Sequence, residues 1–201
     1  MKILVIIPLF AVSLIAYFSL KNEVNEQKLN SGIDGSGITI YSTSPNEPVK
    51  KKLKTMTLRE KIAQMVIGSA IPEGLTESSA EFKKLRRLCE ETKIGGFIFF
   101  KGSCSDYARL SNQLQQLSET PLLISADFER GTKMRVTDGV LFPNNMAIGA
   151  ANNPDLSYKM GLEIARETRL LGVHQNYSPV CDVNNNPNNP IINVRSFGED
   201  P

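Results

Sequence analysis

Apolar residues recur at helical spacing in several separate stretches of the chain, which predicts amphipathic helices. The first helix begins with Thr57-Leu58-Arg59-Glu60, a capping box in which the Thr hydroxyl and the Glu carboxylate each satisfy a backbone N–H. Ser105 is the expected N-cap of the third helix, and the fourth begins at Asn153-Pro154 and ends at Gly172. In chain order, the apolar faces of the predicted helices are Leu58, Ile62 and Met65; Phe82, Leu85 and Leu88; Tyr107, Leu110, Leu114 and Leu117; and Leu156, Met160, Ile164 and Leu171.

Short apolar runs lie next to these helices and predict strands. Residues 94–100 read Ile-Gly-Gly-Phe-Ile-Phe-Phe, an unbroken run that is typical of a parallel strand covered on both faces. Residues 66–70, 121–127 and 173–180 are the other predicted strands. Strands that alternate with helices through short links indicate a parallel α/β sheet. A doubly wound sheet would be complete in a domain of this size, whereas a (β/α)₈ barrel needs about 250 residues.

The amino-terminal part of the chain has a different composition. Residues 1–20 combine Lys2 with an apolar run, a pattern typical of a secretory signal peptide or an uncleaved signal anchor. Either interpretation predicts export, to the periplasm or to the outer face of the inner membrane. Residues 21–54 are polar, with frequent Ser, Gly and Asn, and predict a linker that ends in a solvated run of lysines. Residues 55–201 are then the folded domain.

Composition narrows the possible functions. Hydrophobic residues make up 41% of the chain and charged residues 22%, as in ordinary globular domains, which argues against wholesale disorder. The net charge of +2 gives no general attraction to polyanions, so nucleic acid is not an expected partner. A membrane is expected to be contacted only through the amino-terminal segment. Cys89, Cys104 and Cys181 lie far apart in the sequence, which argues against a disulfide scaffold or an ordinary zinc site.

Two further motifs are weak candidates for chemistry. Residues 182–186 read Asp-Val-Asn-Asn-Asn, like the start of a calcium loop, but Pro187 stands where glycine is needed and Asn193 where glutamate is needed. No metal or cofactor is therefore expected. His174 follows a Gly-Val pair at the start of a predicted strand, and ligands bind at the other end of such strands. A packing role is expected for this histidine.

The strongest candidate is Asp127, because it ends a strand of apolar or small residues. Ligands of parallel α/β folds bind at the carboxyl ends of strands, so this carboxylate is expected to face the site. Arg135 follows eight residues later, and a carboxylate beside a guanidinium binds polyols by accepting and donating hydrogen bonds. The alternative is an Asp–Arg pair that only fixes the loop. Arg195, an isolated arginine in a predicted loop, is a weaker candidate by pattern alone.

Several motifs together resemble the N-terminal barrel domain of glycoside hydrolase family 3, and most closely its bacterial β-N-acetylglucosaminidases (β-N-acetylhexosaminidases). They occur in the family's order and spacing, and the resemblance covers about residues 55–201. It implies that this part is the N-terminal portion of a (β/α)₈ barrel, incomplete in this chain. It also implies that Asp127, Arg135 and Arg195 contact hydroxyls of the terminal sugar. The motifs are Ile94-Gly95-Gly96-Phe97-Ile98-Phe99; Asp127-Phe128-Glu129-Arg130-Gly131 with Met134-Arg135; Phe142-Pro143; Ile148-Gly149-Ala150; Asn176-Tyr177-Ser178-Pro179-Val180-Cys181-Asp182-Val183-Asn184; and Arg195-Ser196-Phe197-Gly198-Glu199-Asp200-Pro201.

The sequence also departs from the family's pattern. Arg130 stands where the family usually has a second glycine. The family's acid/base histidine and aspartate nucleophile lie further along the chain than Pro201, and a retaining glycosidase needs both an acid and a nucleophile. The resemblance therefore implies retaining hydrolysis of terminal β-linked N-acetylhexosamine, for example from peptidoglycan fragments, by a protein of which this chain is an inactive part.

Two other functions remain open from the sequence. One is a β-glucosidase of the same family, which shares the barrel motifs. The other is a non-catalytic, membrane-tethered glycan-binding protein, which would bind saccharides without turning them over.

Overall fold

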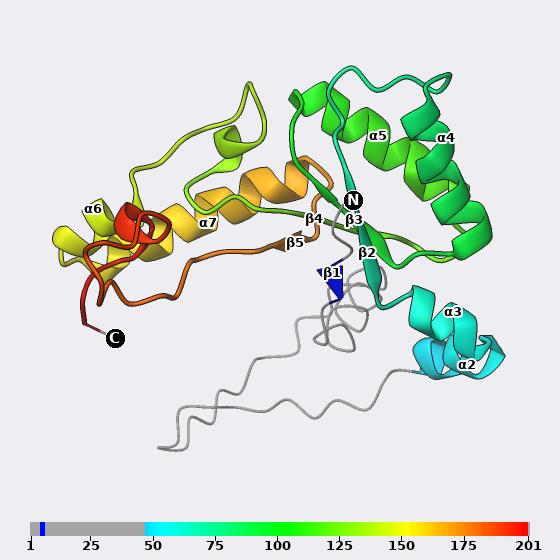
Figure 1. Cartoon of the computed structure of the whole chain (residues 1–201), viewed down its shortest axis with the longest axis horizontal. Helices are drawn as coiled ribbons and strands as arrows, with labels where there is room; N and C mark the ends of the chain where they lie inside the picture. The colour runs from blue at the N-terminus through cyan, green and yellow to red at the C-terminus, as the bar shows by residue number, and fades with distance from the viewer. Residues whose placement is uncertain (1–4, 7–46, 201) are drawn as a thin grey trace.

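The computed structural model describes residues 5–6 and 47–200 (Figure 1). The strands of this part form a sheet in the order β1-β2-β3-β4-β5. β2 through β5 pair in parallel with their neighbours, and β1 pairs antiparallel with β2. The strands are β1 (Val5–Ile6), β2 (Val66–Ala70), β3 (Gly96–Phe99), β4 (Leu123–Ala126) and β5 (Gln175–Asn176).

The strand order distinguishes the two architectures that the sequence pattern allows. A doubly wound sheet reverses its strand order at a switch point, whereas a β/α barrel adds each new parallel strand to the same edge. Strands β2 to β5 follow one another along the sheet in sequence order with no reversal. This arrangement is that of a barrel-type sheet.

Helices follow the parallel strands, as expected. In chain order they are α2 (Glu47–Thr55), α3 (Leu58–Ala63), α4 (Ala80–Arg87), α5 (Cys104–Leu117), α6 (Asn145–Ala150) and α7 (Pro154–Leu170). A π-helical turn, Leu88–Thr92, continues α4. The cap of α7 is confirmed, because Asn153 accepts from Asp155 N–H and Pro154 occupies the first turn. The predicted cap of α5 is wrong by two residues: Ser103 accepts the N–H of Asp106, and Ser105 lies within the first turn.

The last predicted strand is much shorter than expected. Only Gln175–Asn176 pairs with β4, whereas residues 173–180 were expected to be extended. Pro179 has no N–H to donate to a ladder, and the segment leaves the sheet after Tyr177. This departure carries the chain away from β5 and toward the site described below.

The main core lies between the sheet and the helices. Figure 1 shows α4 and α5 packed together on the same side of the strands. Phe97 and Phe99 of β3 are fully buried against the side chains of these helices, and Ile98 points to the other face, where it packs with Ile67 and Leu123. The alternation follows from the two-residue period of a strand. The predicted two-sided burial of this strand is therefore confirmed, although Ile98 itself is only partly buried.

A glycine allows β3 and β4 to pair closely. A Cβ atom at Gly96 would lie 2.0 Å from the carbonyl oxygen of Leu123. Since that oxygen is backbone, it cannot move aside without disturbing the sheet. The apolar run 94–100 therefore includes glycine for a steric reason.

The apolar residues of α3 do not face the core. Leu58 is 74% exposed and Ile62 is 54% exposed, and Ala63 is the buried residue of this short helix. Leu156, at the start of α7, is exposed as well. Helical spacing identifies a common face, but it does not say whether a neighbouring element covers that face.

Part of the expected linker is helical. Residues 47–54 form most of α2, and Lys52 of this helix makes an ion pair with Glu119. The predicted signal segment and the rest of the linker lie outside the described residues, apart from β1. Among the residues that the structure describes, no helix has the length and apolar character needed to cross a membrane.

The capping box of α3 makes a pH-dependent contribution to stability. The Lys93 ammonium, 2.7 Å from Glu60, and the backbone N–H of Thr57 together lower the pKa of Glu60 from 4.5 to about 2. Because the pKa is lower in the folded state, the stabilisation is complete above pH 4.5 and is lost as the pH falls toward 2. We expect Glu60→Gln to lower the urea midpoint at neutral pH and to have a smaller effect at about pH 3. An equal effect at both pH values would contradict this assignment.

Candidate functional site

The end of β4 fixes the position of Asp127. The backbone N–H of Tyr177 donates to Ala126 at 3.0 Å, and the N–H of Phe128 donates to the side-chain oxygen of Asn176 at 2.9 Å. These bonds hold the backbone on both sides of Asp127 against β5. The carboxylate therefore leaves the carboxyl end of the sheet from a rigid position, as the sequence predicts.

Arg135 is the direct partner of Asp127. Its Nη2 lies 2.9 Å from the Asp127 carboxylate, and its guanidinium carbon lies 5.5 Å from the centre of the Phe100 ring. Both side chains of the ion pair are about a quarter to a third exposed, so a ligand can reach them. The aromatic face and the carboxylate together orient the guanidinium.

The loop between these two residues depends on Gly131. Its φ is +111°, and a Cβ atom there would lie 2.3 Å from the carbonyl oxygen of Val140. Glycine alone adopts this backbone without strain. The loop then makes the short helical turn Thr132–Met134, which brings Arg135 back to Asp127.

Arg195 reaches the same region but has a different partner. Its Nε and Nη2 donate to the two carboxylate oxygens of Glu129, with an Nε–Oε2 distance of 2.8 Å. Glu129 is buried, and the ion pair raises the pKa of Arg195 further. The two hydrogen bonds from Arg195 to Glu129 fix the plane of the guanidinium. Asn145 also donates to the Arg195 carbonyl oxygen at 2.8 Å.

Two of the three predicted residues line one cavity at the carboxyl ends of the strands. Asp127 and Arg195 both line it, and its volume is about 380 Å³. Arg135 is not among its lining residues, but it donates a hydrogen bond to Asp127. The remaining lining residues are Ile67, Ile98, Phe100, Glu129, Tyr177 and Val180. The Tyr177 hydroxyl is buried and has no hydrogen-bond partner among the described residues, so a polar ligand in the cavity could satisfy it.

Several residues of this cavity are not indicated by the sequence pattern. Glu129 enters the sequence analysis only as part of the motif that starts at Asp127, yet it is the partner of Arg195. Its position was the available signal, because it follows the same strand end as Asp127 by only three residues. Phe100 and Tyr177 each follow the end of a strand, which is the position where ligand contacts are expected.

The weaker candidates lie elsewhere. His174 accepts the N–H of Ile124 through its Nδ1, at the amino-terminal half of β4, away from Asp127. The expectation that it lies at the opposite end from the site is therefore confirmed. The Asp182 carbonyl oxygen accepts from Ser196, which holds the two loops together. No group of potential metal ligands occurs among the described residues.

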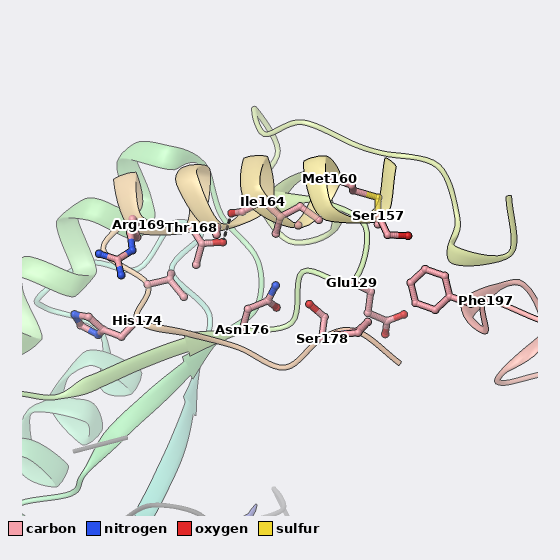
Figure 2. Close-up of a pocket in the computed structure, with 14 residues that line it drawn as sticks. Glu129, Ser157, Met160, Ile164, Thr168, Arg169, His174, Asn176, Ser178 and Phe197 are labelled. Atoms are coloured by element: carbon pink, nitrogen blue, oxygen red, sulfur yellow. Dashed lines mark hydrogen bonds between the residues drawn. The ribbon is translucent and has the colours of Figure 1, made fainter. Parts of the chain in front are cut away.

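A second cavity runs along α7 (Figure 2). Its volume is about 460 Å³, and Met160, Ile164 and Thr168 of the helix face the segment that carries Asn176 and Ser178. The Thr168 hydroxyl donates back to Ile164, so it does not offer its hydrogen to the cavity. Although this cavity is larger, neither Asp127 nor Arg195 lines it, and we assign the candidate site to the smaller one, which both residues line.

The sequential parallel strands, with a cavity at their carboxyl ends that charged side chains line, define a domain of the β/α barrel class. The model of the glycosyl hydrolase family 3 N-terminal domain matches residues 57–201. The chain belongs to this family, and its described part is the N-terminal portion of the family's (β/α)₈ barrel.

Individual relatives agree with this assignment. The chain is 38% identical over 131 residues to β-hexosaminidase A of Pseudoalteromonas piscicida, covering 59% of this chain and 22% of that protein. It is 36% identical over 107 residues to a β-N-acetylglucosaminidase/β-glucosidase of Cellulomonas fimi, covering 53% and 19%. The chain thus spans about a fifth of the length of these relatives. Among solved structures, the β-glucoside phosphorylase BglX bound to 2FGlc superimposes with a TM-score of 0.70 at 25% identity, covering 82% of this chain and 29% of that one.

Proposed function

We propose that the cavity beside Asp127 binds a terminal β-linked N-acetylhexosamine and that the protein hydrolyses its glycosidic bond with retention. The observation that carries the proposal is a cavity that Asp127 and Arg195 both line, with Arg135 paired to the Asp127 carboxylate. Sugar hydroxyls both donate and accept, so a fixed carboxylate beside fixed guanidinium groups binds them at both kinds of atom.

The reacting groups are proposed to lie outside the described residues. Hydrolysis with retention needs one carboxylate that attacks the sugar and one acid that protonates the leaving oxygen. The two carboxylates that line the cavity, Asp127 and Glu129, each accept hydrogen bonds from an arginine. That pairing suits substrate orientation and leaves neither as a free proton donor. These residues therefore hold the sugar for groups supplied by another part of the protein.

N-acetylhexosamine is favoured over glucose as the substrate by the similar relatives. The P. piscicida protein is named a β-hexosaminidase, and the C. fimi protein carries both activities in its name. A β-glucosidase is therefore the second candidate. The two differ in whether the acetamido group at C2 of the sugar adds to binding.

The two candidates predict different results in a titration. We expect the 201-residue chain to bind N-acetylglucosamine about tenfold more tightly than glucose, which corresponds to ~1.4 kcal/mol, in a calorimetric or NMR titration. Equal affinity for both sugars would support the β-glucosidase instead. Absence of binding to either sugar would overturn the proposed site.

The same chain also tests the placement of the reacting groups. We expect no turnover of a chromogenic β-N-acetylglucosaminide by the 201-residue chain. Appreciable hydrolysis would contradict the proposal that the nucleophile and the acid lie outside the described residues. Binding without turnover is also what a non-catalytic glycan-binding protein would show, and that candidate is separated from the glycosidase by assaying the protein encoded by the whole gene.

We also propose that the protein acts after export, in the cell envelope. The support is the apolar run behind Lys2, which is typical of a signal peptide or signal anchor. Glycans of the envelope would then be the carbohydrate partner. Fractionation of cells followed by detection of the protein in the periplasm or the inner membrane tests this, and recovery in the cytoplasm would contradict it.

A further inference from the structure

Thr132 begins the short helical turn that brings Arg135 back to Asp127. Its carbonyl oxygen accepts the backbone N–H of Arg135 at 3.0 Å and that of Val136 at 2.8 Å. On the other side, the Arg135 carbonyl oxygen accepts the N–H of Gly102 at 3.2 Å. The backbone of Arg135 is therefore held by two contacts, and Thr132 supplies one of them.

The side chain of Thr132 attaches this turn to its surroundings. It is 1% exposed, and its hydroxyl accepts the backbone N–H of Val140 at 3.2 Å. The same hydroxyl donates to a carboxylate oxygen of Glu167 at 2.5 Å. The first bond closes the loop on itself, and the second joins the loop to α7. Because a hydrogen bond to a carboxylate is stronger than one between neutral groups, the bond to Glu167 is the stronger of the two.

Glu167 has no competing partner. It lies in the last turn of α7 and is partly buried. Among the described residues no cation forms an ion pair with it, and the neighbouring Arg166 pairs with Glu163 instead. A partly buried carboxylate without a cation depends on hydrogen bonds. The Thr132 hydroxyl supplies such a bond, so the carboxylate stays directed toward the loop.

Helix α7 is a rigid support for this contact. Met160, Ile164 and Thr168 are its buried residues, and they pack the helix into the core of the domain. A site is held in a productive geometry when its side chains are supported by hydrogen bonds from rigid elements. The Asp127 loop receives such support from α7 through Thr132 and Glu167.

We propose that Glu167 and Thr132 are positioning residues for sugar binding. Neither lines the cavity beside Asp127, so they act through other side chains. Their hydrogen bond holds the turn that places the Arg135 guanidinium, and that guanidinium orients the Asp127 carboxylate, which does line the cavity. This inference rests on the proposed function, since it takes that cavity as the site of the sugar.

Two substitutions at Thr132 separate its hydroxyl from the shape of its side chain. Thr132→Val keeps the shape without the hydroxyl, and we expect the 201-residue chain with this change to bind N-acetylglucosamine about tenfold more weakly in an NMR titration. Thr132→Ser keeps the hydroxyl and should bind within about twofold of the natural chain. Natural affinity in Thr132→Val, or an equal loss in both variants, would overturn the proposed role of the hydroxyl.

Two substitutions at Glu167 test the same bond from the helix side. Glu167→Leu offers no acceptor and should weaken sugar binding about tenfold, whereas Glu167→Gln keeps an acceptor for the Thr132 hydroxyl and should weaken it little. Since both leave the loop sequence unchanged, they decide the question if Thr132→Val does not fold. Natural affinity in Glu167→Leu would contradict the proposal.

Thr168→Val is the matched control. It removes the hydroxyl of another buried threonine, on the same helix, whose partner is the Ile164 carbonyl oxygen and not the loop (Figure 2). We expect this variant to bind the sugar with natural affinity even where its urea midpoint falls. A loss equal to that of Thr132→Val would mean that any buried threonine of this region matters as much, and would overturn a positioning role.

The Arg135 Nε–H resonance reports the position of the guanidinium directly. This atom is buried, so its proton is protected from exchange with water, and its absence in Arg135→Lys assigns the signal in a ¹H–¹⁵N spectrum. The resonance should shift in Thr132→Val and in Glu167→Leu but not in Thr168→Val. An unshifted resonance in the first two variants would overturn the inference. Failure of the natural chain to bind N-acetylglucosamine would instead overturn the proposed sugar site, and the resonance would still show whether the two residues place Arg135.

Discussion

Asp127→Asn should weaken the binding of N-acetylglucosamine by the 201-residue chain about 10- to 100-fold, because a hydrogen bond to a charged group contributes ~1.5–3 kcal/mol. Asparagine keeps the shape of the side chain but removes the charge that orients Arg135, whose Nη2 lies 2.9 Å away. The sugar would then lose a strong acceptor, and the guanidinium would lose its anchor. A calorimetric or NMR titration of both chains with the monosaccharide measures the change.

Asp155→Asn provides the control for this substitution. It makes the same chemical change at an exposed position at the start of α7, away from the cavity. Its affinity for the sugar should equal that of the natural chain. If Asp127→Asn also bound the sugar with unchanged affinity while remaining folded, the carboxylate would have only the role of fixing the loop, which is the alternative that the sequence left open.

Local signals in the sequence predicted most of the helices and strands and the first half of the candidate site. The capping box at Thr57 and the cap at Asn153 are confirmed, since a cap depends only on residues within one turn. Asp127 and Arg135 are eight residues apart, so a strand end and one short loop were enough to bring them together. In both cases the relevant partners are near in sequence.

Features that depend on distant residues were not predictable in the same way. Arg195 and Glu129 are 66 residues apart, and nothing local to Arg195 indicates a buried carboxylate as its partner. The exposure of Leu58 depends on which element covers α3, and helical spacing does not contain that information. The strand order, which selects the barrel over the doubly wound sheet, is likewise a property of the folded chain.

The ion pair of Glu129 and Arg195 should respond unequally to removal of its two members. The Glu129 side chain is 7% exposed, whereas that of Arg195 is 39% exposed. Arg195→Gln leaves a buried carboxylate without its cation, and we expect it to lower the free energy of unfolding by about 2–3 kcal/mol. Glu129→Gln leaves a guanidinium that water can reach, so its cost should be about 1 kcal/mol. Urea unfolding at neutral pH measures both.

The double variant Glu129→Gln/Arg195→Gln separates the buried charge from the lost packing. It should be more stable than Arg195→Gln alone, because the unpaired carboxylate is gone and two amides can bond to each other. All three variants should bind N-acetylglucosamine more weakly, since each one removes the two-point pairing that orients the guanidinium in the sugar cavity. Equal stability of the two single variants would mean that water reaches Glu129 as easily as Arg195.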